Sequence, residues 1–398
     1  MIFQSLGSNY TGNDVLQAAF GLGSESDAKM LTNLLIERYG GDVQLFYKCR
    51  EALAAGLDLV PYSEPKVAII GFTCYAVYQA VEAVGGEAIY IDQAKDSLNF
   101  TLTELQKVYK KHTDLSAVIV QNTLGVPAPI RKIREFCDKN DLILIEDLAH
   151  SIGAEYASGE EVGTVGDMTC LSFSRDKVVD AVSGGALVVR NKDLAKGMTS
   201  DRPKKLAKSI GWRDRIYPFL AMLVRANYFI GLGKVFHKIF IRLGYMQKAT
   251  DVSGAIPPQA MPYWNARAAL NGFSDLALRL NRRRKIARIY ADNLPTDMLV
   301  SDAVSAIERG TNLRFPVVAE DRDSLIQNLR KFGVHVSDTW YDSPVAPPRH
   351  LEKTNYAVGA CPNAEDMTKR IVNLPTHHGV SEAMAKLIAE RIRSWHSQ

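Results

Sequence analysis

The residues best suited to chemistry lie between Leu142 and Arg190. An apolar run at 142–145 is followed directly by Glu146 and Asp147, and His150 comes three residues later. A short apolar run bounded by charge is typical of a buried parallel strand. We therefore predict that Asp147 and His150 lie at the carboxyl end of a strand, where open α/β sheets bind their ligands.

A lysine follows the next strand-like run of the chain. Residues 169–174 have β-type composition, Lys177 comes next, and a glycine pair at 184–185 opens the apolar run 186–189. A lysine amine can form a Schiff base with the aldehyde of pyridoxal 5'-phosphate (PLP). A carboxylate can keep the pyridine nitrogen of PLP protonated. The alternative is that Asp147 caps a strand or helix and Lys177 is solvated, because such pairs also occur by chance.

The residues around this pair carry a family resemblance. The run IEDLAHSIGA at 145–154 resembles the EDxAHxxGA segment of the DegT/StrS-type sugar aminotransferases. The run SFSRDK at 172–177, with its later glycine pair, resembles that family's SFHxxK…GEGG segment at the same spacing. Ser174 and Ser183 depart from the pattern, since the family often has His and Glu there. The resemblance implies four roles: Lys177 as the catalytic Schiff-base lysine, Asp147 as the pyridinium partner, His150 near the ring hydroxyl, and Ser172 on the phosphate.

Two further turns are assigned to the cofactor by the same resemblance. The family's SGTxAL turn, whose backbone N–H groups hold the PLP phosphate at a helix N-terminus, corresponds to 48–53. Only its Ala-Leu end is matched, because Lys48, Cys49 and Arg50 replace the small residues. Cys49 and Arg50 are thus predicted to bind the phosphate, although Arg50 can equally be a solvated first-turn residue. Cys74 corresponds to the side chain over the PLP face, and its alternative role is a buried apolar residue.

Strands and helices alternate through the first half of the chain. Helices are predicted at 24–39, 51–57, 77–84, 99–111 and 125–139, and strands at 44–47, 67–70, 88–92, 117–122, 142–145, 169–174 and 183–189. This alternation favours a doubly wound α/β fold with a mostly parallel sheet. Neither a GxGxxG nor a GxxxxGK[ST] motif is present, which argues against a dinucleotide fold and a P-loop. The resemblance implies fold type I of the PLP-dependent transferases, with a mostly parallel seven-stranded sheet flanked by helices and a small α/β C-terminal domain.

The chain of 398 residues is long enough for a large and a small domain. We predict a large PLP-binding domain at 1–261, and a connecting helix with the small domain at 262–398. The connecting helix is predicted as one long helix at 262–294, and the last helix at 381–395. His377 and His378 are interpreted as turn residues, and no metal site is predicted. The family's GxNxRM segment, which reaches the partner subunit's cofactor, is poorly matched at 257–261, but a homodimer is still implied.

Positive charge is concentrated in one segment. Residues 203–248 contain ten Lys or Arg and one acid, a net +9, whereas the whole chain carries +4. The remainder is therefore acidic, which argues against a nucleic-acid-binding surface. Within an insert at about 203–250, the stretch 216–245 is hydrophobic and is split by Arg225. Beyond Gly233 the pattern predicts an amphipathic helix, with Lys234, Lys238 and Arg242 on one face. Such a helix suits peripheral membrane contact, and the alternative is a core or dimer-interface helix.

The five cysteines show neither CxxC pairing nor zinc spacing, so a reducing compartment is expected. The first residues lack a basic stretch followed by a long apolar core, so no signal peptide is expected. We predict a cytoplasmic protein, located at the inner face of the membrane if the insert binds lipid.

Together these features predict a PLP-dependent aminotransferase. The resemblance implies an amino-acid donor, glutamate, and a nucleotide-linked keto-sugar acceptor, in cell-surface polysaccharide or amino-sugar biosynthesis. Two alternatives are a catalytically weak or inactive scaffold or regulatory protein, and a PLP-dependent sugar dehydratase. Lys177 counts against the dehydratase, because the known dehydratase variant has His at that position.

Overall fold

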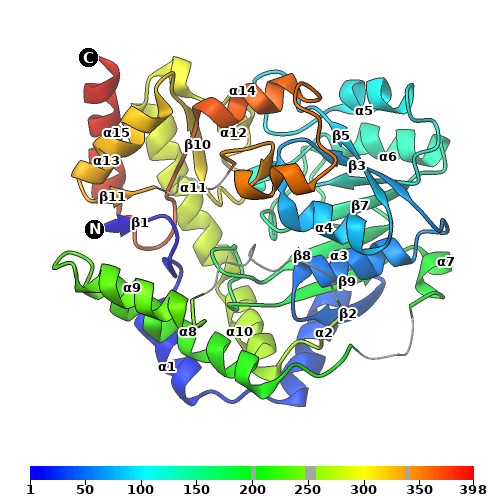
Figure 1. The fold of residues 1–398 in the computed structure, drawn as a ribbon, viewed down its shortest axis with the longest axis horizontal. Helices are drawn as coiled ribbons and strands as arrows, with labels where there is room; N and C mark the ends of the chain where they lie inside the picture. The colour runs from blue at the N-terminus through cyan, green and yellow to red at the C-terminus, as the bar shows by residue number, and fades with distance from the viewer. Residues whose placement is uncertain (199–202, 247–256, 337–340) are drawn as a thin grey trace.

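The computed structural model describes residues 1–198, 203–246, 257–336 and 341–398 (Figure 1). At its centre is a seven-stranded sheet with the strand order β2-β9-β8-β7-β6-β3-β5. The strands are β2 (Asp42–Phe46), β3 (Lys66–Ile70), β5 (Glu87–Ile91), β6 (Ala117–Val120), β7 (Ile143–Leu148), β8 (Met168–Ser172) and β9 (Gly185–Val189). Strand β9 is antiparallel to both of its neighbours, and the other pairs are parallel. The predicted mostly parallel seven-stranded sheet is confirmed.

The strands are apolar on both faces because helices cover both faces. In β3, Val67 and Ile69 pack with α3 (Cys49–Asp58) and α4 (Tyr75–Ala83). The alternate residues, Ala68 and Ile70, pack in the core on the other face. That core also contains residues of α2 (Glu25–Tyr39), α5 (Leu102–Tyr109), α6 (Ile130–Lys139) and α10 (Tyr263–Ser274).

Capping residues lie within two residues of the helix starts predicted at 24 and 99. Ser24 caps α2 in a capping box with Asp27, and Thr101 caps α5 in a capping box with Glu104. In each box the side chain at the cap and the acid three residues later satisfy backbone N–H groups that have no partner within the helix. These local signals explain why the sequence located both helices to within a few residues.

The single long helix predicted at 262–294 is wrong, because the helix divides at Asp275. Helix α10 ends at Ser274, and α11 (Leu276–Asn293) begins after the junction. Asp275 has φ −94° and ψ 0°, outside the helical range. Gly272, Ser274 and Asp275 all have low helix propensity. Gly272 also packs closely on Val179, with only 2.9 Å available to an added Cβ, so this glycine serves packing.

A second core lies in the C-terminal part of the chain. It joins the far half of α11 with β10 (Phe315–Val318), α13 (Arg322–Lys331), β13 (Ile371–Leu374) and α15 (Glu382–His396). Strands β10 and β13 form an antiparallel pair. The N-terminal strand β1 (Ile2–Phe3) pairs with β11 (Val334–His335), so both ends of the chain lie beside this core (Figure 1). His377 Nε2 lies 2.8 Å from the Phe3 carbonyl oxygen, in the turn before α15.

The basic insert forms a helical hairpin at one edge of the molecule (Figure 1). Helix α8 (Lys208–Ala226) is followed by α9 (Leu232–Arg242), which confirms the helix predicted beyond Gly233. Helix α1 (Gly12–Phe20) packs on α8. Residues 247–250 of the predicted insert lie outside the described part of the chain. None of the described helices combines the length and the hydropathy needed to cross a membrane.

Candidate active site

Five of the predicted site residues lie where the parallel strands reach their carboxyl ends. Asp147 is the penultimate residue of β7, and Ser172 is the last residue of β8. Cys49 opens α3 directly after β2, and Cys74 closes the short strand β4 (Thr73–Cys74) after β3. Lys177 lies in the connection from β8 to β9. Residues far apart in the sequence therefore meet at one edge of the sheet, as the strand pattern predicts.

The charges of Lys177 and Asp147 act on each other. Burial lowers the pKa of Lys177, and the Cys74 thiol, Asp147 and Cys49 oppose that shift. Burial raises the pKa of Asp147 to about 6, against a hydrogen bond from the Ala149 N–H and the charge of Lys177. The Ala149 nitrogen lies 2.8 Å from Asp147 Oδ1. Mutual effects of this kind require two charged groups close together in a poorly solvated space.

His150 is held neutral beside this pair. Burial lowers its pKa well below the usual value, and the charges of Lys177 and Arg314 add to the effect. Its Nδ1 accepts a hydrogen bond from the Leu124 N–H at 3.1 Å. A neutral imidazole whose Nδ1 accepts must carry its proton on Nε2. His150 therefore offers a hydrogen-bond donor rather than a second positive charge.

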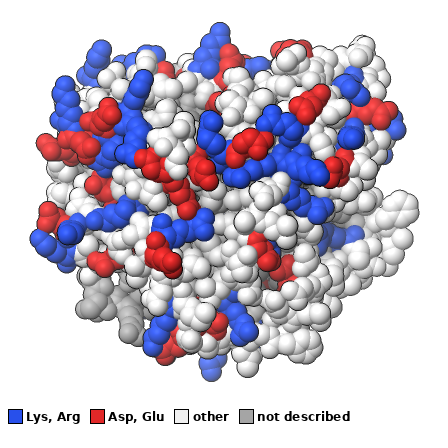
Figure 2. Space-filling model, turned by 180° about the vertical axis from the view of Figure 1, so that it is seen from behind, with Lys and Arg blue, Asp and Glu red and all other residues white. Residues whose placement is uncertain are grey.

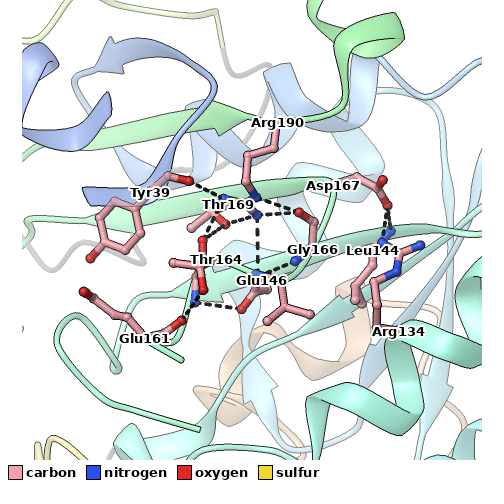
Figure 3. Close-up of polar contacts among 12 residues, drawn as sticks. Tyr39, Arg134, Leu144, Glu146, Glu161, Thr164, Gly166, Asp167, Thr169 and Arg190 are labelled. Carbon is pink, nitrogen blue, oxygen red and sulfur yellow. Dashed lines mark hydrogen bonds and ion pairs between the residues drawn. The ribbon is translucent and has the colours of Figure 1, made fainter. Parts of the chain in front are cut away.

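Glu146 and Asp147 are adjacent acids with different surroundings. Successive strand residues point to opposite faces of a sheet. Glu146 is fully buried, and its carboxylate accepts hydrogen bonds from the Gly163, Val165 and Gly166 N–H groups and the Tyr156 hydroxyl. Figure 3 shows Glu146 within this network, with Arg190 3.5 Å away. Its acceptor positions are taken up by the protein, so Glu146 is structural and Asp147 is the acid facing the site.

The start of α3 forms a positively charged cradle. The cap residue Lys48 makes no side-chain capping bond, so the first N–H groups of the helix keep their positive dipole end. Gly185 lies against this start, because an added Cβ would come within 2.5 Å of the Cys49 nitrogen. Gly184 has φ +137°, a conformation that side chains rarely adopt. The glycine pair is therefore needed for β9 to approach the helix start.

Two cations, Lys48 and Arg50, lie at this cradle and are partly removed from water. Burial lowers the pKa of Lys48 to about 8 and also lowers the pKa of Arg50. Arg50 Nη1 donates to Gln79 Oε1 at 2.5 Å. Lys48 Nζ donates to Ser183 Oγ at 2.6 Å. Two of the departures from the family pattern, Lys48 and Ser183, thus contact each other. An anion between these groups would offset the cost of burying their charge.

These residues fit PLP. The cradle of helix start and cations suits a phosphate, and Ser172 is paired with Gly185 beside it. The Asp147 carboxylate suits a pyridinium nitrogen, and the half-buried Lys177 amine suits an aldehyde. The described residues contain no cluster of three or more His, Cys, Asp or Glu arranged to hold a metal ion.

Hydrogen bonds support the backbone of the connection that carries Lys177. Asp180 accepts hydrogen bonds from the Tyr10 hydroxyl at 2.6 Å and from the Asp176 N–H at 2.7 Å. Asn9 Nδ2 donates to the Lys177 carbonyl oxygen at 3.0 Å. The N-terminal segment therefore fixes the backbone on both sides of the lysine.

Three site residues were missed by the sequence analysis. Tyr341 is buried against Phe72, with ring centroids 4.5 Å apart, and its hydroxyl accepts from Gln121 Nε2 at 3.3 Å. Burial raises the pKa of Tyr341, and Cys74 and Asp147 add to the rise. Arg314 lowers the pKa of both Lys177 and His150. Only Gln121 had a usable signal, since it is a polar residue directly after a buried strand.

Comparisons with known proteins point in one direction. The model of the DegT/DnrJ/EryC1/StrS aminotransferase family matches residues 48–393. The chain is 26% identical to UDP-N-acetyl-3-dehydro-alpha-D-glucosamine 3-aminotransferase of Acidithiobacillus ferrooxidans over 340 residues, covering 85% of this chain and 79% of that protein. It is 24% identical to GDP-perosamine synthase of Escherichia coli O157:H7 over 345 residues, with 83% and 79% covered.

The fold has the same relatives. The solved structure of the aminotransferase TlmJ from Streptoalloteichus hindustanus superposes with a TM-score of 0.72 at 20% identity, covering 100% of this chain and 99% of that one. This similarity confirms the predicted fold type I architecture.

Proposed function

The chain belongs to the DegT/DnrJ/EryC1/StrS aminotransferase family, and we propose that Lys177 and Asp147 are the residues through which it works on PLP. Family membership makes the protein a PLP-dependent aminotransferase. The observation that supports the two roles is their electrostatic coupling at the carboxyl edge of the sheet.

Bound PLP supplies an aldehyde that bonds to amines and a ring that withdraws electrons from the reacting carbon. Asp147 keeps a proton on the ring nitrogen, which maintains that withdrawal. With a pKa of about 6, Asp147 is mostly ionised at neutral pH, and pairing with a pyridinium would favour the ionised form further. The single hydrogen bond from Ala149 orients the carboxylate without exhausting its acceptor capacity.

Lys177 would accept and return the proton that moves between carbon atoms during transamination. Because burial lowers its pKa, a larger fraction of its amine is neutral near pH 7 than for an exposed lysine. The neutral amine is the form that would bond to the PLP aldehyde and would later accept a proton from the substrate carbon. Asn9 and Asp180 hold the backbone around it, so that the amine returns to the same place after each transfer.

The remaining predicted residues bind and orient. His150 would donate from Nε2 toward the ring hydroxyl, and Ser172 would bind the phosphate together with the α3 start, Cys49 and Arg50. Cys74 would lie over one face of the ring, and the pairing of β4 with β12 (Val345–Ala346) holds this residue in place. We propose these roles from their positions at one sheet edge.

For substrates, we propose a nucleotide-linked keto-sugar as acceptor and glutamate as amino donor. The relatives named above act on UDP- and GDP-linked sugars by their names. The resulting amino sugar would serve cell-surface polysaccharide or amino-sugar biosynthesis.

We further propose a homodimer, the domain division at 261/262, a cytoplasmic location, and peripheral membrane contact through 216–245. The five cysteines are all free thiols, which supports a reducing compartment.

The test is a spectrum followed by a transfer assay. Wild-type protein loaded with PLP is expected to show the visible band of a cofactor bonded to a lysine amine, and glutamate should bleach it. The Lys177→Ala variant should lack the band and the turnover. UDP-, GDP- and dTDP-linked keto-sugars are then screened by measuring the 2-oxoglutarate formed.

The outcomes separate the alternatives. A band that no amino acid bleaches would favour the scaffold alternative. Bleaching by glutamate without transfer to any sugar would refute the sugar acceptor but not transamination. Loss of water from the sugar without consumption of glutamate would identify a dehydratase.

A further inference from the structure

The α8–α9 hairpin has an outer surface of exposed apolar side chains. Phe229 and Ile230, in the turn between the helices, are 84% and 64% exposed. The outward side of α9 continues this surface with four more exposed residues: Leu232, Val235, Ile239 and, directly after the helix, Leu243. Residues spaced three and four apart lie on one helical face. Leu232, Val235, Ile239 and Leu243 therefore share one face of α9, and together with Phe229 and Ile230 of the preceding turn we call them the α9 stripe.

Basic residues border the α9 stripe along its length. Lys234, Lys238 and Arg242 are exposed and recur every fourth residue on the adjoining side of the helix. Between 203 and 246 the one acidic residue is Asp214, and it is buried. The outer surface of the hairpin therefore combines apolar side chains with positive charge and carries no negative charge.

The hairpin is held firmly from its inner side. Tyr217, Leu220, Ala221 and Val224 of α8 pack with Tyr10 and Val182 in a core of their own. The Arg175 guanidinium lies 4.1 Å from the centre of the Tyr217 ring, which joins α8 to the connection carrying Lys177. The buried side of the hairpin is thus formed without the residues of the α9 stripe. The hairpin lies at the left of Figure 1 and therefore at the right of Figure 2, which is turned by 180°. The surface that projects there is largely white, the colour of residues other than Lys, Arg, Asp and Glu.

We propose that the α9 stripe docks on a membrane surface containing anionic phospholipids. The apolar groups would enter the boundary between head groups and acyl chains, and the lysine and arginine stems would extend along them to reach lipid phosphates. Each cation near such a surface adds attraction. The helix is parallel to the membrane in this arrangement, consistent with its lack of a spanning length.

A second copy of the chain fits this surface less well. In a two-fold dimer the same patch meets itself, which would bring Lys234, Lys238 and Arg242 of both copies together with no exposed acid in the hairpin to balance them. A nucleic acid would use the cations but leave Phe229 and Ile230 in water. Charge and apolarity together therefore favour a lipid surface.

The test is co-sedimentation of the PLP-loaded full-length protein with phosphatidylcholine vesicles, with and without phosphatidylserine. Wild type is expected to bind the anionic vesicles and to be released by salt. The Lys234→Gln/Lys238→Gln/Arg242→Gln variant should bind about a hundredfold more weakly, since each cation near an anionic surface contributes about fivefold. A Phe229→Ser/Ile230→Ser variant should lose at least about tenfold.

Matched controls come from exposed residues elsewhere. Lys110→Gln/Lys132→Gln/Lys139→Gln removes the same charge on the side of α5 and α6, far from the hairpin in Figure 1. Val358→Ser/Leu278→Ser removes two exposed apolar residues outside the hairpin. Both controls should bind anionic vesicles like wild type.

Three results would overturn the proposal. The first is wild type that does not sediment with phosphatidylserine vesicles at low salt. The second is a hairpin variant that binds as its control does. The third is a Phe229→Ser/Ile230→Ser variant whose molar mass by light scattering falls to that of a single chain, which would make the stripe a subunit interface. Transamination of soluble substrates is measured in parallel, and its outcome does not bear on vesicle binding.

Discussion

Replacing Asp147 by Asn should stabilise the cofactor-free protein and inactivate the enzyme. Asp147 is 3% exposed, and burial raises its pKa from 3.8 to about 6. A shift of about two pKa units means that the ionised carboxylate costs about 3 kcal/mol in the folded state. Asparagine has the same shape, can accept the Ala149 hydrogen bond, and carries no charge to desolvate.

The size of this stabilisation depends on pH. Because the folded pKa lies above the unfolded one, this carboxyl contributes fully to stability below about pH 4 and loses that contribution as pH rises through 6. Wild type and Asp147→Asn should therefore unfold at similar temperatures near pH 4. At pH 7 the variant should unfold about 4 °C higher, since 398 residues give an unfolding entropy of about 2.1 cal/mol/K each.

Thermal unfolding from pH 4 to pH 8, without and with PLP, measures this difference. PLP should stabilise wild type more than the variant, because the pyridinium pairs with the carboxylate. Transamination by the variant should fall by at least about a hundredfold. A variant that is less stable than wild type at pH 7 without cofactor, or as active as wild type, would refute the reasoning.

Two further substitutions test neighbouring groups. Glu146→Gln should cost about 2 to 4 kcal/mol of stability in urea unfolding, because an amide cannot accept all the donors that face this carboxylate, and an unchanged midpoint would contradict the structural role. Arg50→Ala should weaken PLP binding by about tenfold to a hundredfold in a fluorescence titration. The exposed control Lys132→Ala should leave PLP affinity unchanged. Equal affinities of Arg50→Ala and wild type would show that Arg50 does not bind the cofactor.

The central sheet could be predicted because its signals are local. Apolar runs of strand length, capping residues such as Ser24 and Thr101, and the position of Asp147 after its strand all act within a few residues. The family motifs then supplied roles for residues that composition alone leaves ambiguous, such as Cys49 and Cys74. Those roles stay predictions until the variants are measured.

What could not be predicted depends on contacts between distant parts of the chain. Tyr341 reaches the site from beyond 340, and Asn9 reaches the Lys177 carbonyl across 168 residues. Neither position has a periodicity or a motif that would mark it. The break at Asp275 was missed because an apolar pattern continues across it, although Gly272, Ser274 and Asp275 all have low helix propensity.

The most direct test of the account is to locate the cofactor bond. Borohydride reduction of the PLP-loaded protein, followed by digestion and peptide mass spectrometry, identifies the lysine that carries the pyridoxyl group. The structure offers a rival within the same site, since Lys48 is a buried amine whose pKa is about 8. We predict the label on Lys177 alone, and a label on Lys48, or no lysine label at all, would contradict the account.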